Sequence, residues 1–283
     1  MAGRFARSLA LAKASWSVIR ADKELLWLPV LSVLALLLLL GSFVAPAVAL
    51  GAFDAAATAG DPPTALAFGT FVFYVLAYFV AIFFNTALVG AAMIRMDGGN
   101  PTLRDGLAIA SSRVGRIFGY AVIAATVGLL LRALEERVGW VGQFVVRLFG
   151  VAWTLATFLV VPVLVTRDVG PIDAVKESAA LLRETWGENL IGTVGLGLAF
   201  AAAYIVVFLA AGGLILLASN AGLPVIIIAT LLLAVIALVV LSALQATMQG
   251  VYSAALYRHA TEPGRPFAGF TPELLDVAFK PKG

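Results

Sequence analysis

Long apolar stretches, separated by short charged segments, dominate the pattern along the chain. No charged residue occurs within 25–53, 62–94 or 189–257, and a helix needs only about 20 apolar residues to cross a bilayer. Cutting the chain at its charged and turn-forming segments predicts six transmembrane helices, with Pro224 in the first turn of the last one. Their predicted limits are Leu26–Leu50, Thr70–Ile94, Gly115–Leu134, Gln143–Thr166, Leu190–Ala218 and Pro224–Tyr257.

The first apolar run follows a charged segment, and together they read ASWSVIRADKELLWLPVL, Ala14–Leu31. A cleaved secretory signal would need a short basic region and an apolar run of about 7 to 15 residues, and both are longer here. A soluble amphipathic helix is disfavoured because no charged residue interrupts Leu25–Gly41. The pattern instead favours a surface helix in which Phe5, Leu9, Trp16 and Ile19 share one face, followed by a retained first span.

Composition excludes several classes of protein. The chain of 283 residues is 62% hydrophobic and 12% charged, whereas soluble domains have roughly 25% charged residues. It has no cysteine and one histidine, His259, so we expect no disulfide, no metal site and no cofactor. The formal charge of +3 is too small to indicate a nucleic-acid partner.

Lysine and arginine are distributed unevenly among the predicted loops. Of the 19 such residues, all but Arg132, Arg137 and Arg147 fall in the N-terminal segment, the second and fourth loops and the C-terminal tail. Short loops rich in Lys and Arg stay on the cytoplasmic side of a membrane. Both termini are therefore expected in the cytoplasm.

A repeated order of elements follows the second, fourth and sixth predicted spans. AAMIRMDGGNPTLRDGLAIASS, LVTRDVGPIDAVKESAALL and ALYRHATEPGRPFAGFTPELLDV each contain a helix end, an arginine, Gly and Pro, and an amphipathic segment. ASWSVIR, ASSRVGR and ALLRETW precede the three odd-numbered spans. These segments predict a repeated unit that consists of a surface helix and a two-span hairpin. The alternative is that each short cytoplasmic loop carries arginine, glycine and proline only to set the orientation of the spans, without a repeat.

These patterns predict an all-α fold, a polytopic transmembrane bundle of about six spans arranged as three repeats of surface helix plus hairpin. Residues 1–283 are expected to form a single integral membrane domain. It comprises an interfacial amphipathic helix over 1–24, the six-span bundle over 25–258 and a cytoplasmic tail over 259–283.

Polar residues inside the predicted spans are the candidates for a solute or headgroup groove. Ser242, Gln245, Gln249 and Ser253 are spaced three, four and four residues apart, which places them on one face of the sixth span. Asn85 lies in the middle of the second span. The alternative is that these side chains form hydrogen bonds at a packed helix seam.

Arginines at the predicted span ends are candidates for contacts with anionic headgroups, because a cation is favoured both there and at a helix C-terminus. Arg147 is expected to reach the outer interface, with an anion site shared with Glu135 or Glu136 as the alternative. The candidate headgroup contacts are Arg95, Arg167, Arg258, Arg20 and Arg116.

Enzyme signatures are missing from the sequence. It contains no Gly-rich phosphate loop, nucleophile elbow or metal-ligand spacing. Asp97 and Asp168 lie in predicted cytoplasmic loops, where pairing with arginines is expected; an interfacial hydrolase that uses both is the alternative. We therefore expect a protein that is not an enzyme.

The segment SWSVIRADKELLWLP at 15–29 and the hairpins with arginine- and glycine-containing turns resemble a family of uncharacterised prokaryotic integral membrane proteins, a domain of unknown function. The resemblance implies six spans and a prokaryotic cytoplasmic (inner) membrane, but no substrate. The leading hypothesis is a scaffold, accessory subunit or lipid-organising element, with anionic lipids as partners and a membrane protein as a further candidate partner. The competing hypothesis is a transporter of a small solute or lipid that uses the polar stripe of the sixth span.

Overall fold

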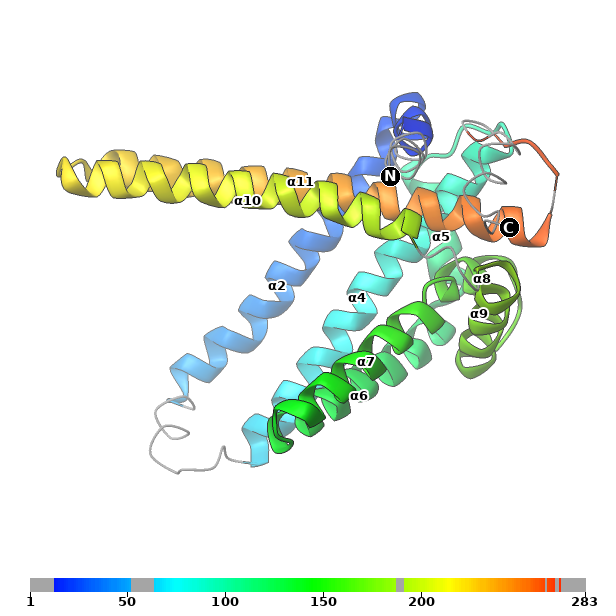
Figure 1. The fold of residues 1–283 in the computed structure, drawn as a ribbon, viewed down its shortest axis with the longest axis horizontal. Coiled ribbons are helices and arrows are strands. Elements are labelled where there is room, and N and C mark those ends of the chain that lie inside the picture. Colours follow the sequence, from blue (N-terminus) through cyan, green and yellow to red (C-terminus); the bar gives the residue numbers. More distant parts are fainter. Residues whose placement is uncertain (1–12, 52–63, 187–190, 263, 268–269, 271–283) are drawn as a thin grey trace. The chain divides into compact units, whose positions relative to one another are not determined.

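The computed structural model describes residues 13–51, 64–186, 191–262, 264–267 and 270 (Figure 1). Within these ranges the regular structure is helical and no strand forms, which confirms the all-α prediction. Residues 13–21 form the first described helix. The elements after it are η1 (Lys23–Leu26), α2 (Trp27–Ala49), α4 (Thr64–Met96), α5 (Leu103–Ser112), α6 (Val114–Arg137), α7 (Trp140–Ala156), α8 (Val160–Thr166), α9 (Pro171–Trp186), α10 (Ile191–Asn220) and α11 (Pro224–Thr261).

Within the described residues, six helical segments are long and apolar enough to cross a membrane, as the sequence predicts. Length and apolar composition identify the protein as an integral membrane protein. The segments are Lys23–Ala49, Leu66–Met96, Val114–Arg137, Trp140–Thr166, Gly197–Asn220 and Pro224–Thr261.

The fourth span consists of two helices, α7 and α8, where the sequence predicts one. Pro162 has no N–H to donate to the preceding turn, so the helix cannot continue unchanged through this point. The chain tightens instead, and the N–H of Val160 donates to the carbonyl of Thr157 at 3.1 Å. The N–H of Leu159, released at the break, donates to the Oγ of Ser178 in α9 at 3.0 Å, and this bond is buried.

The described residues pack into two compact units, which we treat separately. The first unit draws on Met1–Val30, Ala91–Leu103 and Thr185–Gly283, and the second on Leu31–Gly90 and Arg104–Glu184. The expectation of a single domain stays a prediction.

In the first unit, α10 and α11 lie side by side as a long hairpin (Figure 1). Gly222 has a φ of +67°, a backbone conformation that favours glycine, and it closes the turn before Pro224 starts α11. Most large side chains along this hairpin are exposed; Leu209, for example, is 71% exposed. Near its C-terminal end, before the last turn, α11 is buried continuously from Gly250 to Tyr257.

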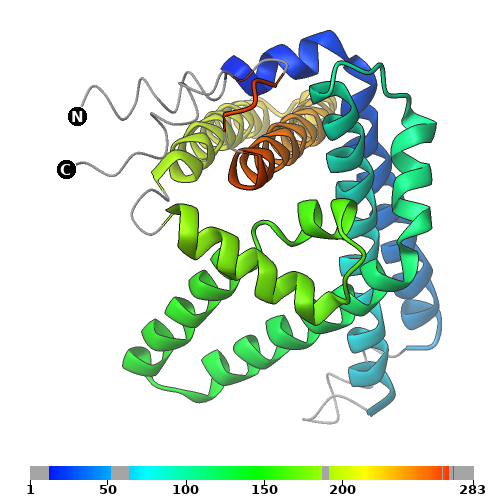
Figure 2. The same cartoon turned by 90° about the vertical axis from the view of Figure 1, so that its right-hand side faces the viewer.

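In the second unit, α6 and α7 form a hairpin that leads into α8 and α9 (Figure 2). All six residues from Val160 to Val165 in α8 are buried. A Cβ on Gly119 of α6 would lie 2.8 Å from the Cγ of Pro171 in α9, so the two helices meet too closely for a side chain there. Phe118 of α6 packs edge-on against Phe79 of α4, with ring centroids 5.8 Å apart.

The helix at 13–21 is buried along one side. Ala14, Ser15, Val18 and Ile19 are buried, whereas Trp16 is 41% exposed. Trp16 therefore does not share the buried side of Ile19, and it is free to take the interfacial position that tryptophan favours in membranes. Phe5 and Leu9, the other members of the predicted apolar face, lie outside the described residues.

Candidate functional site

The polar stripe on α11 makes local hydrogen bonds. Ser242 donates to the carbonyl of Val239 at 2.9 Å, and Ser253 donates to the carbonyl of Gly250 at 2.9 Å. Both hydroxyls therefore donate their hydrogen bonds to carbonyls of their own helix, as serine commonly does.

The amide side chains of the predicted groove are less enclosed than its last serine. Ser253 is 6% exposed, Gln245 is half-buried and Gln249 is exposed. On α4, in the second unit, Asn85 is exposed. A role for these residues in transport stays a prediction.

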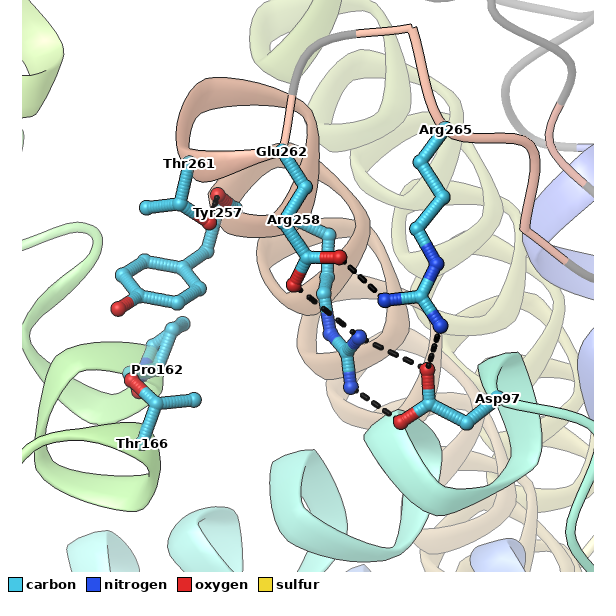
Figure 3. Close-up of polar contacts among 8 residues, drawn as sticks. All are labelled: Asp97, Pro162, Thr166, Tyr257, Arg258, Thr261, Glu262 and Arg265. Carbon is cyan, nitrogen blue, oxygen red and sulfur yellow. Dashed lines mark hydrogen bonds and ion pairs between the residues drawn. The ribbon is translucent and has the colours of Figure 1, made fainter.

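Among the described residues of the first unit, an extensive polar cluster surrounds Asp97, just after α4 (Figure 3). Both terminal amino groups of Arg258 in α11 donate to this carboxylate, one of them to Oδ1 at 2.8 Å. The same guanidinium contacts Glu262 at 3.3 Å. Arg265 completes a closed ring by pairing with Glu262 and, at 3.4 Å, with Asp97.

Arg258 is the most enclosed member of this cluster. The side chain of Arg258 is 11% exposed and that of Asp97 is 38% exposed. Both guanidinium carbons lie about 6 Å from the ring centre of Phe267, at 5.9 Å for Arg258 and 6.0 Å for Arg265, which is within cation–π range. The Nε of Arg258 is buried without a hydrogen-bond partner among the described residues.

Local structure explains why these side chains converge. Gly98, at a φ of +85°, ends α4 immediately after Asp97. Arg258 sits in the last turn of α11, where a cation is favoured by the helix dipole. Beyond α11, backbone hydrogen bonds join Phe267 and Phe270, both of which are buried. The cluster thus ties the ends of the second and sixth spans together.

Asp22 and Glu24 have structural roles that were not predicted from the sequence. Asp22 is buried and caps η1 by accepting from the N–H of Glu24 at 3.2 Å. Its second oxygen has no hydrogen-bond partner among the described residues, and burial raises the pKa of Asp22. Glu24 accepts from the N–H of Leu103 at 2.8 Å, so it caps the start of α5. An aspartate directly before the helical KELL segment was the available signal.

The other predicted headgroup arginines occupy different environments. Arg20 is exposed on the helix at 13–21. Arg95 donates to the carbonyl of Gly99 at 3.1 Å, beyond the end of α4. Arg167 pairs with Glu177 of α9 at 2.8 Å. These positions leave their predicted headgroup contacts untested.

Arg116 belongs to a corner of the second unit where α6 begins and α8 ends. It pairs with Asp168, just past α8. Its neighbour Arg113 donates through Nε to the carbonyl of Val165, in α8, at 3.0 Å. Burial and the like charge of Arg116 lower the pKa of Arg113. Arg113 is one of the basic residues of the second predicted loop, but its sequence context predicted no site for it.

At the opposite ends of α6 and α7, arginines pair with nearby carboxylates. Arg147 contacts Glu135 at 2.8 Å, and Arg132 contacts Glu136 at 3.1 Å. The side chain of Arg147 is 69% exposed, so this pair is open to the surroundings. Among the described residues, no three His, Asp or Glu side chains gather in a way that could hold a metal ion.

Comparison with known proteins identifies one family. A model for a family of unknown function (DUF6159) matches residues 65–267, which confirms the resemblance to an uncharacterised family. The N-terminal segment 15–29 that carried the resemblance lies outside the matched range. No curated protein matches the chain.

Proposed function

The chain belongs to this family of unknown function, so the family suggests no activity for it. From the chain's own residues, we propose a non-enzymatic role in the membrane. The protein acts as a scaffold, an accessory subunit or a lipid-organising element. Its basic helix ends bind anionic headgroups, and its apolar faces contact acyl chains or a membrane-protein partner.

The observation that carries this proposal is the contrast between the apolar faces of the spans and the basic helix ends. Large side chains along α10 and α11 are mostly exposed, as Leu209 and Val225 illustrate at 71% and 76%. The arginines instead gather at the ends of spans, as Arg95, Arg113 and Arg116 do. Lipid satisfies both kinds of surface at once, because it offers hydrocarbon beside anionic phosphate.

The proposed location is the cytoplasmic membrane of a prokaryote, with both termini in the cytoplasm. Since the chain lacks cysteine, an Ala57→Cys variant carries one label site with no background. Position 57 lies in the first predicted outer loop, so a membrane-impermeant thiol reagent should label it in whole cells. Labelling only after the cytoplasmic side is opened would overturn this orientation.

Gentle extraction of the tagged protein from its native membrane, followed by mass spectrometry of bound proteins and lipids, tests the role. We expect either a stoichiometric membrane-protein partner or an excess of anionic lipid over the bulk membrane. Bound lipid of bulk composition, with no partner, would contradict the proposal.

The competing proposal is transport of a small solute or lipid, and the exposed amide of Gln249 supports it. Purified protein in vesicles would then move a solute, and Gln249→Leu would slow that movement without lowering thermal stability. Asn85→Leu serves as a second probe on α4. Solute movement that both variants leave unchanged would remove these residues from the mechanism.

A further inference from the structure

We propose that the corner formed by the start of α6 and the end of α8 binds the phosphate of an anionic phospholipid. Its principal residues are Arg113 and Arg116, and we refer to it as the α6–α8 corner. The inference rests on the proposed lipid-binding role and gives it a specific location.

Arg113 supplies the first charge, and its position is fixed. The bond from Nε to the carbonyl of Val165, 3.0 Å long, holds one edge of the guanidinium against the last turn of α8. The outer edge, with its two terminal amino groups, makes no ion pair among the described residues. A planar guanidinium anchored on one edge is prepared to receive two phosphate oxygens on the other.

Arg116 supplies a second charge that is only partly balanced. Its side chain is 33% exposed, whereas that of its partner Asp168 is 86% exposed. A carboxylate so open to solvent neutralises its neighbour weakly. The like charge of Arg116 also contributes to the lowered pKa of Arg113, so the two cations feel each other. Two arginines with one solvated carboxylate leave a positive excess for an anion.

The level of the corner in the membrane matches a lipid headgroup. The third span begins at Val114 and the fourth ends at Thr166, so the guanidiniums lie where both helices leave the apolar layer. Val114 and Phe118 of α6 are 48% and 45% exposed, so the same helix also presents apolar surface to acyl chains at this level.

The ligand class follows from this combination. Free phosphate could use the two guanidiniums but would have to reach them from solution. The phosphate of a phospholipid is already present at high local concentration at this depth. A lipid with one net negative phosphodiester, such as phosphatidylglycerol, provides the charge that the corner lacks.

The test compares four variants of the full chain with the wild type for retention of phosphatidylglycerol over phosphatidylcholine from mixed vesicles. Removing one juxtamembrane positive charge typically lowers binding about five-fold, and we expect at least this loss for Arg113→Gln and Arg116→Gln. Asp168→Asn removes the competing carboxylate and should raise retention. Arg104→Gln removes an exposed charge outside the corner and should change retention far less.

The opposite signs protect the test from misfolding, since a damaged protein would not gain lipid in the Asp168→Asn variant. Equal losses for Arg113→Gln and Arg104→Gln, with no gain for Asp168→Asn, would overturn the corner while leaving general lipid binding intact. Wild-type protein without any preference for phosphatidylglycerol would instead overturn the lipid-binding role itself. Displacement of the lipid by inorganic phosphate at constant ionic strength would show that the corner takes free phosphate and would overturn the lipid assignment.

Discussion

The ion pair between Asp97 and Arg258 offers the sharpest test of what holds the first unit together. We consider Asp97→Ala, Arg258→Met and the double variant. Asp97→Ala leaves Arg258, 11% exposed, with Glu262 as its remaining carboxylate partner. Arg258→Met leaves an Asp97 that is 38% exposed and still paired with Arg265. The aspartate substitution should therefore be the more damaging of the two.

The magnitude follows from the geometry. Opposite unit charges 2.8 Å apart, the separation of one Arg258 amino group from Asp97 Oδ1, attract by about 6 kcal/mol at an effective dielectric constant near 20. The cost of desolvating both groups offsets much of this gain. Stranding a buried charge typically costs about 3 to 5 kcal/mol. We expect a loss of about 3 kcal/mol for Asp97→Ala, about 1 to 2 kcal/mol for Arg258→Met, and a double variant less destabilised than their sum.

The assay is chemical unfolding of the purified protein in detergent, followed by circular dichroism. A control cycle on Lys176 and Asp173, whose side chains are 73% and 66% exposed, should give a coupling of at most about 0.5 kcal/mol. The reasoning is refuted if the losses of the two single variants add up to the loss of the double variant within about 0.5 kcal/mol. Additive losses would mean that the Asp97 and Arg258 side chains do not stabilise each other.

Three further substitutions test other contacts by the same unfolding assay. Asp22→Asn should increase the free energy of unfolding at neutral pH, because burial raises the pKa of Asp22 and so disfavours its charged form. This gain should vanish as the pH falls below the ordinary carboxyl pKa, where the aspartate is protonated in both the folded and the unfolded state. A gain that does not change with pH would contradict this cause. Ser178→Ala leaves the buried N–H of Leu159 without its acceptor and should cost about 1 to 3 kcal/mol; a neutral effect would mean that water replaces the hydroxyl. Gly119→Ala should destabilise the protein, since its Cβ would lie 2.8 Å from the proline ring of α9. Gly41→Ala is the control: the space around Gly41 is open, so this variant should be neutral or stabilising by up to about 1 kcal/mol. Equal effects of the two variants would refute the close helix contact.

The spans could be predicted from sequence because they depend on length and apolar composition alone, which are local properties. The break in the fourth span could not be located, although Pro162 signalled it. The position at which the helix breaks depends on which side chain can accept a hydrogen bond from the released backbone N–H. That acceptor, Ser178, comes 19 residues after Leu159.

The polar sites were harder to predict, because a charged side chain takes its role from partners distant in the chain. Arg258 and Asp97 are 161 residues apart, and Arg113 and Val165 are 52 apart. The sequence could place these arginines at span ends by their hydropathy context. It could not separate an arginine enclosed by carboxylates from one with an open edge, since both follow an apolar run in the same way.

The hairpin of α10 and α11 has a consequence for how the chain is made. From Asn189 to Tyr257 no residue is charged, and the turn between the two helices is only the three residues from Ala221 to Leu223. Carrying this turn across the bilayer during biosynthesis therefore transfers no formal charge, the most costly component of loop translocation. In the proposed orientation, with both termini in the cytoplasm, the last two spans can enter the membrane together, and Arg258 and the residues after it stay on the side of synthesis.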